Sequence, residues 1–206
     1  MNPCAMIKPI KGTLAACIAL SLLAACGDQG GGEAPGEPPL AGASIGGPFE
    51  LVNSAGETVR WADFDGKYRI VYFGYAYCPD VCPTDVARFM RGYAQFKEAE
   101  PELAAQVQPI FISIDPDRDT PAVVGEFTNA FSDDLIGLTG SQEQVNAAAS
   151  AFSVYHEKGE ENEEGGYLMN HSSATYLFGR EGQPIALLPT DVGPEAVAAE
   201  LEKWVF

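Results

Sequence analysis

The chain has 206 residues, a length that suits one folded domain plus a targeting segment better than two domains. Its 12 Lys and Arg residues are outnumbered by 29 Asp and Glu residues, which gives a formal net charge of −17 at pH 7. Because nucleic acids and anionic membrane surfaces are bound by clustered Lys and Arg, this charge argues against both as partners.

The N-terminal segment has the pattern of a secretory leader. Lys8 and Lys11 form a basic start, residues 14–23 are apolar, and small residues precede Cys26. The apolar run is too short to span a bilayer comfortably. The tetrapeptide Leu23-Ala-Ala-Cys26 resembles the bacterial lipoprotein box, in which the cysteine is acylated and becomes the new N-terminus.

These features predict a three-part chain. We expect a lipoprotein signal peptide over residues 1–25, a flexible Gly- and Pro-rich tether over 26–46 and one folded domain over 47–206. Lipid on Cys26 would anchor the protein to a membrane of the bacterial cell envelope, facing the periplasm or another extracytoplasmic space.

The folded part alternates between predicted strands and helices. The expected strands lie at residues 49–52, 58–61, 69–75, 107–114, 135–138, 173–178 and 185–188, and the expected helices begin near residues 82, 121, 141 and 194. The first two strands flank Asn53-Ser54-Ala55-Gly56 and predict an N-terminal β-hairpin. This order predicts an α/β fold with a central mixed β-sheet flanked by helices, for which a thioredoxin-like layout is one candidate.

The segment Cys78-Pro-Asp-Val-Cys82-Pro83 follows the most apolar predicted strand. Since proline lacks an N–H, the helix after it begins no earlier than about Asp80, a favourable capping residue. Cys78 then lies in the loop and Cys82 in the first helical turn. Both sulfurs can meet at a helix N-terminus, whose partial positive charge favours thiolate.

This cysteine pair has two interpretations, a structural disulfide and a site for chemistry. A structural disulfide would close a very short loop and stabilise the fold little. Three intervening residues, in place of the two of thioredoxin-type redox motifs, allow the sulfurs of Cys78 and Cys82 to spread around an ion. Two thiolates select Cu(I), Zn or iron–sulfur chemistry. The folded part has only two cysteines and two histidines, which is too few for most structural zinc or iron–sulfur sites, whereas two thiolates and one imidazole suit trigonal Cu(I).

Two histidines are candidates for the third ligand. His171 lies among apolar residues just before a predicted strand, which favours a rigid site, and His156 lies beside an acidic run that predicts a solvated side chain. Spacing alone does not choose between them. The run contains Glu157, Glu160, Glu161, Glu163 and Glu164. We interpret it as a solvated loop, with electrostatic guidance of cationic copper or of a basic partner as the alternative.

The motifs taken together resemble the SCO/SenC family. They are Phe73-Gly-Tyr-x-x-Cys-Pro-x-x-Cys-Pro83, Asp115-Pro-Asp-Arg-Asp-Thr-Pro121, Leu138-Thr-Gly140 and the segment around His171. The likeness extends from about Gly46 to the C-terminus. It implies a thioredoxin-like fold, copper as Cu(I) or Cu(II) bound by Cys78, Cys82 and His171, and a role in assembling the CuA centre of cytochrome c oxidase.

Some residues depart from the family pattern or suggest other roles. Ala76-Tyr77 stands where Thr-His is common, and Asn170 where Asp often precedes the histidine.

The resemblance also suggests Asp115 as an outer partner of the copper site. The spacing of acids after Asp115 imitates a calcium loop, but Thr120 occupies its required glycine position, so we expect these acids to cap the following helix and pair with Arg118.

The leading functional hypothesis is a metallochaperone, not an enzyme, that passes copper to the copper-accepting subunit of cytochrome c oxidase. The alternative is a thiol–disulfide oxidoreductase in which Cys78 and Cys82 form a redox-active disulfide and keep the acceptor's cysteines reduced. A peroxide-reducing enzyme fits the proline-flanked pair poorly.

Overall fold

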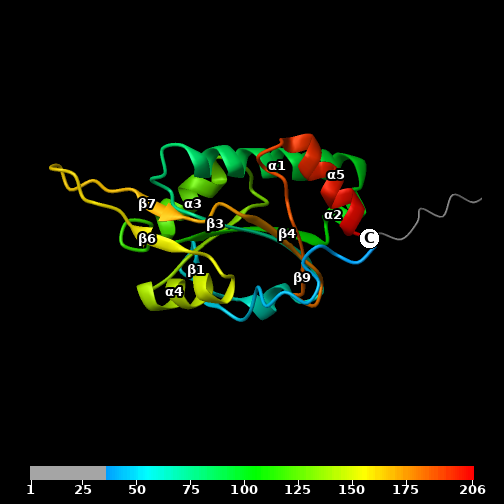
Figure 1. Ribbon diagram of the computed structural model, residues 1–206, viewed down its shortest axis with the longest axis horizontal. Helices are drawn as coiled ribbons and strands as arrows, with labels where there is room; N and C mark the ends of the chain where they lie inside the picture. Colours follow the sequence, from blue (N-terminus) through cyan, green and yellow to red (C-terminus); the bar gives the residue numbers. More distant parts are fainter. Residues whose placement is uncertain (1–35) are drawn as a thin grey trace, which may run out of the picture. The chain divides into compact units, whose positions relative to one another are not determined.

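The computed structural model describes residues 36–206, in which strands and helices alternate along the chain (Figure 1). The elements are β1 (Glu50–Asn53), β2 (Thr58–Arg60), a 3-10 helix η1 (Trp61–Phe64), β3 (Tyr68–Gly74), α1 (Val81–Ala99), α2 (Pro101–Ala104), β4 (Val107–Ser113), α3 (Pro121–Asn129), β5 (Ile136–Thr139), α4 (Gln142–Ala151), β6 (His156–Lys158), β7 (Met169–His171), β8 (Thr175–Phe178), β9 (Pro184–Leu187) and α5 (Pro194–Trp204).

Seven of the strands form one mixed sheet in the order β2-β1-β5-β4-β3-β8-β9. Strands β3, β4 and β5 run parallel, whereas β1 pairs antiparallel with β5 and β8 pairs antiparallel with β3. The expected central mixed sheet and the N-terminal hairpin of β1 and β2 are confirmed. Strand β3 lies inside the sheet, between β4 and β8, and is buried along its whole length, as its nearly continuous apolar sequence predicts.

Side chains of β3 alternate between the two faces of the sheet, as the period of a strand requires. The Tyr72 ring packs near Phe89 of α1, on the face that α1 and α5 cover. The Phe73 ring packs against Phe152 at the end of α4, on the opposite face. Figure 1 shows α1 and α5 on one side of the sheet and α4 on the other. The alternation therefore builds two aromatic-rich cores, one on each face.

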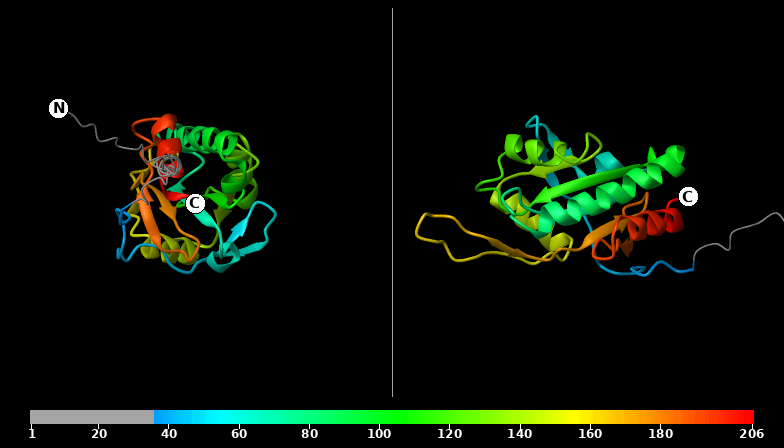
Figure 2. Two further views of the ribbon diagram at one scale, coloured as in Figure 1. Left: turned by 90° about the vertical axis from the view of Figure 1, so that its right-hand side faces the viewer. Right: turned by 90° about the horizontal axis from the view of Figure 1, so that it is seen from above.

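Strands β6 and β7 pair with each other in a separate two-stranded sheet. Their hairpin projects beyond the end of the main sheet, as both Figure 1 and the right-hand view of Figure 2 show. The sequence did not predict these strands or the short helices η1 and α2. The acidic run expected as a solvated loop spans β6 and the exposed tip of this hairpin.

Two helix caps differ from each other in how well the sequence predicts them. Ser141 and Gln144 form the expected capping box of α4, in which Ser141 Oγ accepts the N–H of Gln144. At α3 the cap is Thr120, whose hydroxyl accepts the N–H of Val123. The acids before it were wrongly expected to cap this helix, because Asp115 and Asp119 instead accept hydrogen bonds from other partners.

The segment expected as a tether includes residues that contact the folded part. Leu40 donates a backbone hydrogen bond to Ile185 at 3.0 Å, and Gly46 donates one to Ala151 at 2.9 Å. The hydrogen-bonded part of the chain thus reaches back to Leu40. The leader expected over residues 1–25 and the expected lipid site Cys26 lie outside the described residues, and the division of the chain remains a prediction. No helix within residues 36–206 combines the length and apolarity that crossing a bilayer needs.

Candidate metal centre

Three side chains meet at the carboxyl end of β3, the edge at which α/β sheets usually build their sites. Cys78 comes from the loop after β3, Cys82 from the first turn of α1 and His171 from the end of β7. Their ligand atoms all lie within 4.8 Å of one another. Cys82 Sγ is 3.3 Å from His171 Nε2. The structure therefore brings together the three residues that the sequence and the resemblance singled out.

The start of α1 sets the position of the first sulfur. The helix begins after Asp80, as expected, but the Asp80 side chain makes no capping hydrogen bond. Instead, the backbone N–H of Cys82 donates to Cys78 Sγ at 3.3 Å. A first-turn N–H that would otherwise lack a partner is thereby satisfied by the sulfur. Both cysteines are free and buried, Cys78 at 8% exposure and Cys82 at 0%.

Gly74, the last residue of β3, leaves the space that the second sulfur fills. A Cβ at this position would lie 3.1 Å from Cys82 Sγ and 2.8 Å from Tyr72 Cε1. Both distances are tighter than ordinary van der Waals contact, so a side chain here would displace the ring or the sulfur. Packing around Cys82 therefore explains why the Phe-Gly-Tyr sequence has glycine at position 74.

A backbone carbonyl fixes the tautomer of the half-buried His171. Its Nδ1 lies 2.8 Å from the carbonyl oxygen of Ser172. Since a carbonyl only accepts hydrogen bonds, Nδ1 must carry the proton, which leaves the Nε2 lone pair directed at Cys82 Sγ. Burial also lowers the pKa of His171, partly offset by the Ser172 bond and the charge of Asp85. The imidazole is therefore held neutral, the form that binds metals.

The protonation of Cys82 corrects one expectation. Burial raises the pKa of the Cys82 thiol, and its interaction with Cys78 raises the pKa further. Proximity to the α1 N-terminus was expected to favour thiolate, but a helix terminus supplies at most about 2 kcal/mol. Desolvation of a fully buried sulfur exceeds that. In the metal-free protein Cys82 is thus a thiol whose proton a bound metal must displace.

Two tyrosines and one acid that the sequence analysis missed surround the imidazole. The rings of Tyr72 and Tyr75 meet the His171 ring edge-on, with centroids 6.5 and 5.9 Å away. Tyr72 Oη donates to Asp85 Oδ2 at 3.2 Å, and burial raises the pKa of Asp85. A signal was present in the sequence, because Asp85 lies three residues after Cys82 and so faces the same side of α1.

Asp115 and His156 lie outside the three-residue group. The carboxylate of Asp115 accepts hydrogen bonds from Arg118 Nε at 2.6 Å and Tyr167 Oη at 2.8 Å, so the expected pairing with Arg118 is present. Its suggested role as an outer partner of copper stays a prediction. His156 pairs with His171 across the hairpin, but its Nε2 lies 2.9 Å from Asn146 Oδ1. That contact makes it less solvated than expected.

The mixed sheet carries two thiols where β3 leads into α1, and an imidazole faces them. This arrangement defines a thioredoxin-like domain with a soft-metal site. The family model SCO1/SenC matches residues 37–206. Protein SenC of Rhodobacter capsulatus is 42% identical over 158 residues, covering 77% of this chain and 69% of the relative. The mitochondrial SCO1 homolog 1 of Arabidopsis thaliana is 42% identical over 146 residues, which are 70% of this chain but only 42% of that longer protein.

A solved structure agrees with this relationship. The structure of Bradyrhizobium japonicum ScoI with copper bound superposes with a TM-score of 0.71 at 34% identity, covering 78% of this chain and 99% of that one. The chain belongs to the SCO1/SenC family. The thioredoxin-like fold expected from the sequence is confirmed by this likeness.

Proposed function

We propose that this protein is a copper metallochaperone that binds copper through Cys78, Cys82 and His171. The observation that supports this best is the convergence of two sulfurs and a neutral imidazole within 4.8 Å. This donor set suits Cu(I), and the same thiolates can bind Cu(II). Membership of a family with copper-bound structures supports the choice of metal.

The test is copper binding by the reduced protein and its variants. Wild type should take up one copper per chain and show sulfur-to-Cu(II) charge-transfer absorption. Cys82→Ser should abolish most of that absorption, and His171→Ala should weaken binding and alter the spectrum. His156→Ala is the matched control and should behave like wild type, because His156 bonds to Asn146 instead of facing the sulfurs. Failure of the reduced wild type to bind copper stoichiometrically would refute the proposal.

We propose that the acceptor of the copper is the CuA centre in the copper-accepting subunit of cytochrome c oxidase. Transfer would proceed by ligand exchange, with acceptor thiolates replacing the donors one at a time. Mixing the Cu(I)-loaded and the Cu(II)-loaded protein, in equal amounts, with the copper-free soluble domain of that subunit should produce the spectrum of the mixed-valence CuA centre. Its absence, while glutathione removes the copper readily, would argue for another acceptor.

We further propose the chain division expected above, with a leader over residues 1–25, lipid on Cys26 and a tether before the domain. The tetrapeptide that ends at Cys26, after a basic start and an apolar run, supports this. Cells that express wild type should place it in the membrane fraction of the envelope and incorporate labelled fatty acid into it. Cys26→Ser should lose the label.

A second candidate function, thiol–disulfide exchange, is favoured by the free state and proximity of the two sulfurs. Here the two thiols would be oxidised to a disulfide while a target disulfide is reduced to two thiols. His171→Ala separates the functions. A reductase should keep most of its activity in this variant, whereas a copper carrier should lose affinity.

A further inference from the structure

The hairpin that carries His171 receives little support from the main sheet. Within the described residues β6 and β7 pair only with each other. Two three-residue strands cannot hold a rigid geometry alone, because isolated hairpins are marginal in water. Contacts from other elements must therefore fix the imidazole opposite the sulfurs.

Arg118, in the loop between β4 and α3, supplies such contacts to Tyr167, two residues before β7. Its Nη1 donates to the carbonyl oxygen of Tyr167 at 2.9 Å. Its guanidinium carbon lies 3.6 Å from the centroid of the Tyr167 ring, close enough for a cation–π contact. One arginine thus binds the backbone and the ring of the same hairpin residue.

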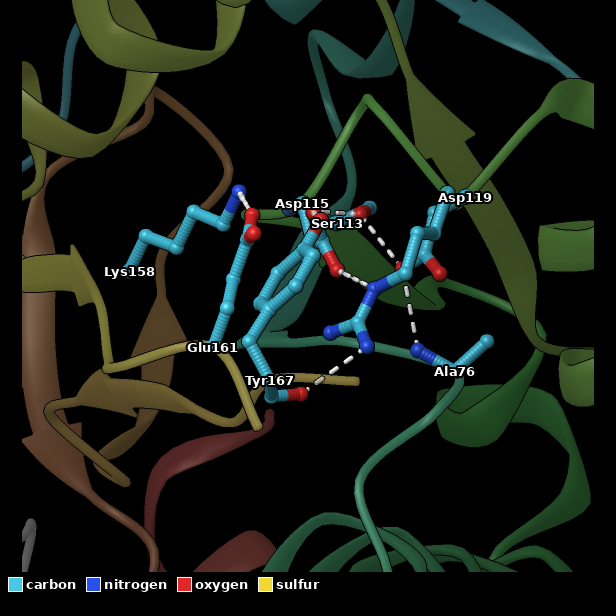
Figure 3. A network of polar contacts seen from close by, with 8 residues as sticks. Ala76, Ser113, Asp115, Asp119, Lys158, Glu161 and Tyr167 are labelled. Atoms are coloured by element: carbon cyan, nitrogen blue, oxygen red, sulfur yellow. Dashed lines mark hydrogen bonds and ion pairs between the residues drawn. The ribbon is translucent and has the colours of Figure 1, made fainter. Parts of the chain in front are cut away.

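Asp115 closes the contacts into a cycle. One of its carboxylate oxygens accepts from Arg118 Nε at 2.6 Å, and the other accepts from Tyr167 Oη at 2.8 Å. We call Asp115, Arg118 and Tyr167 the clasp. Figure 3 shows the Tyr167 ring beside Asp115. The Asp115 side chain is almost fully buried, so these charged hydrogen bonds are little weakened by water.

The clasp is anchored to the elements that carry the cysteines. The N–H of Asp115 donates to Ser113 Oγ at the end of β4, and that hydroxyl donates to Asp119 Oδ2 at 2.6 Å. The same Asp119 oxygen accepts the N–H of Ala76 at 2.9 Å. Ala76 is two residues before Cys78. A continuous set of hydrogen bonds therefore joins the cysteine loop to the histidine hairpin (Figure 3).

We propose that Arg118 is a positioning residue, which through the clasp holds the β6–β7 hairpin so that His171 faces Cys78 and Cys82. This effect on the hairpin is independent of copper, and only its consequence for copper affinity rests on the proposed function. A hairpin released from the clasp must be reordered when copper binds, so the apparent affinity falls by the fraction of molecules in the competent arrangement.

The first test uses the metal-free protein and measures hydrogen exchange in the segment from Tyr167 to His171. Arg118→Gln should raise exchange there about tenfold or more, while exchange in α4 and α5 stays unchanged. Arg180→Gln is the matched control. Arg180 also lies over a tyrosine ring, Tyr68, and donates to a backbone carbonyl, but it does not contact the hairpin.

The second test measures Cu(I) affinity by competition. Arg118→Gln should bind Cu(I) about tenfold more weakly than wild type. Its Cu(II)-loaded form should show an unchanged charge-transfer maximum, which indicates the same ligands. Arg118→Lys keeps the positive charge but lacks the planar guanidinium with its several N–H donors. Its Cu(I) affinity should therefore lie between those of Arg118→Gln and wild type. Tyr167→Phe, which removes a single hydroxyl, should give a smaller loss and serves as the test if Arg118→Gln does not fold.

Equal hairpin exchange in wild type, Arg118→Gln and Tyr167→Phe would overturn the clasp, whatever the copper results. A wild type that binds no copper would instead refute the proposed function, while faster exchange in Arg118→Gln would still support the clasp.

Discussion

At the scale of single residues, the site combines an imidazole already prepared for metal with a thiol that is not. The Ser172 carbonyl and burial keep His171 neutral, with Nε2 free. Burial raises the pKa of Cys82 and keeps it protonated. A soft metal ion supplies the charge that makes a buried thiolate stable. In the metal-free protein His171 and Cys82 are therefore both uncharged, and copper binding must release the Cys82 proton.

Copper affinity should therefore rise with pH. The Cys82 thiol is protonated throughout the neutral range because its folded pKa is raised, so each copper bound releases at least its proton. The His171 pKa is lowered, so the imidazole is already neutral at pH 7 and adds no proton release above that pH. Apparent affinity should increase about tenfold or more from pH 7 to pH 8. Calorimetry in buffers of different ionisation enthalpy measures the protons directly, and a pH-independent affinity would contradict this account.

Gly74→Ala tests whether the missing side chain makes room for the sulfur. The added Cβ would approach the Tyr72 ring and Cys82 Sγ too closely. Overpacking of this kind costs about 1–3 kcal/mol of unfolding free energy. Denaturant unfolding should show that loss, and Cu(I) binding should weaken because the sulfur is displaced. Gly47→Ala is the control, because its Cβ would meet Ala151 at an ordinary 3.4 Å.

At the scale of elements, the sequence predicted the parts whose pattern is local. β3 was expected at residues 69–75 and lies at Tyr68–Gly74, because its seven buried residues are apolar or glycine except for Arg69. The capping box of α4 was likewise predicted from a local pattern, the four residues from Ser141 to Gln144. The hairpin of β6 and β7 was missed, since His-Glu-Lys and Met-Asn-His are too short to show strand-like alternation and Met169 is their one apolar residue.

The same distinction applies to the site. Prolines placed Cys78 and Cys82 correctly at the start of α1, whereas the residues alone left His156 and His171 open. The contacts that orient His171 come from the loop of Arg118, far away in the chain, and no local pattern records them. The protonation of Cys82 was also misjudged, because burial depends on the whole fold.

Ser141→Ala tests the local contribution of the α4 cap. The variant removes the hydroxyl that accepts the N–H of Gln144, and should lower the free energy of unfolding by about 1 kcal/mol. Ser150→Ala, on the exposed face of the same helix, should change it by less than about 0.5 kcal/mol. Equal effects of the two substitutions in chemical denaturation would show that the capping box contributes nothing specific.

At the scale of the whole folded unit, the site occupies one end of β3 and a buried arginine the other. Arg69 is fully buried and donates to the carbonyl of Gly179, between β8 and β9, and to Asp65 after η1, both at 2.9 Å. Its guanidinium also lies 4.5 Å from the Trp61 ring centroid. Arg69 therefore joins three segments that are distant in sequence. A residue of β3 therefore supports stability at this end, whereas the metal site at the other end is formed by residues of the following loop, of α1 and of β7.

Arg69→Met should separate these two properties. The substitution keeps much of the apolar volume but removes the hydrogen bonds that the guanidinium donates to Gly179, Arg180 and Asp65, so the free energy of unfolding should fall by about 1.5–3 kcal/mol. Arg60→Met removes an ion pair with Glu50 that is exposed on both sides, and should cost less than about 1 kcal/mol. Well below its unfolding transition, the Arg69 variant should still bind one copper with the wild-type spectrum, because its contacts lie away from Cys78, Cys82 and His171. A loss of copper binding in the folded variant would instead show that the geometry of the site depends on packing along the whole of β3.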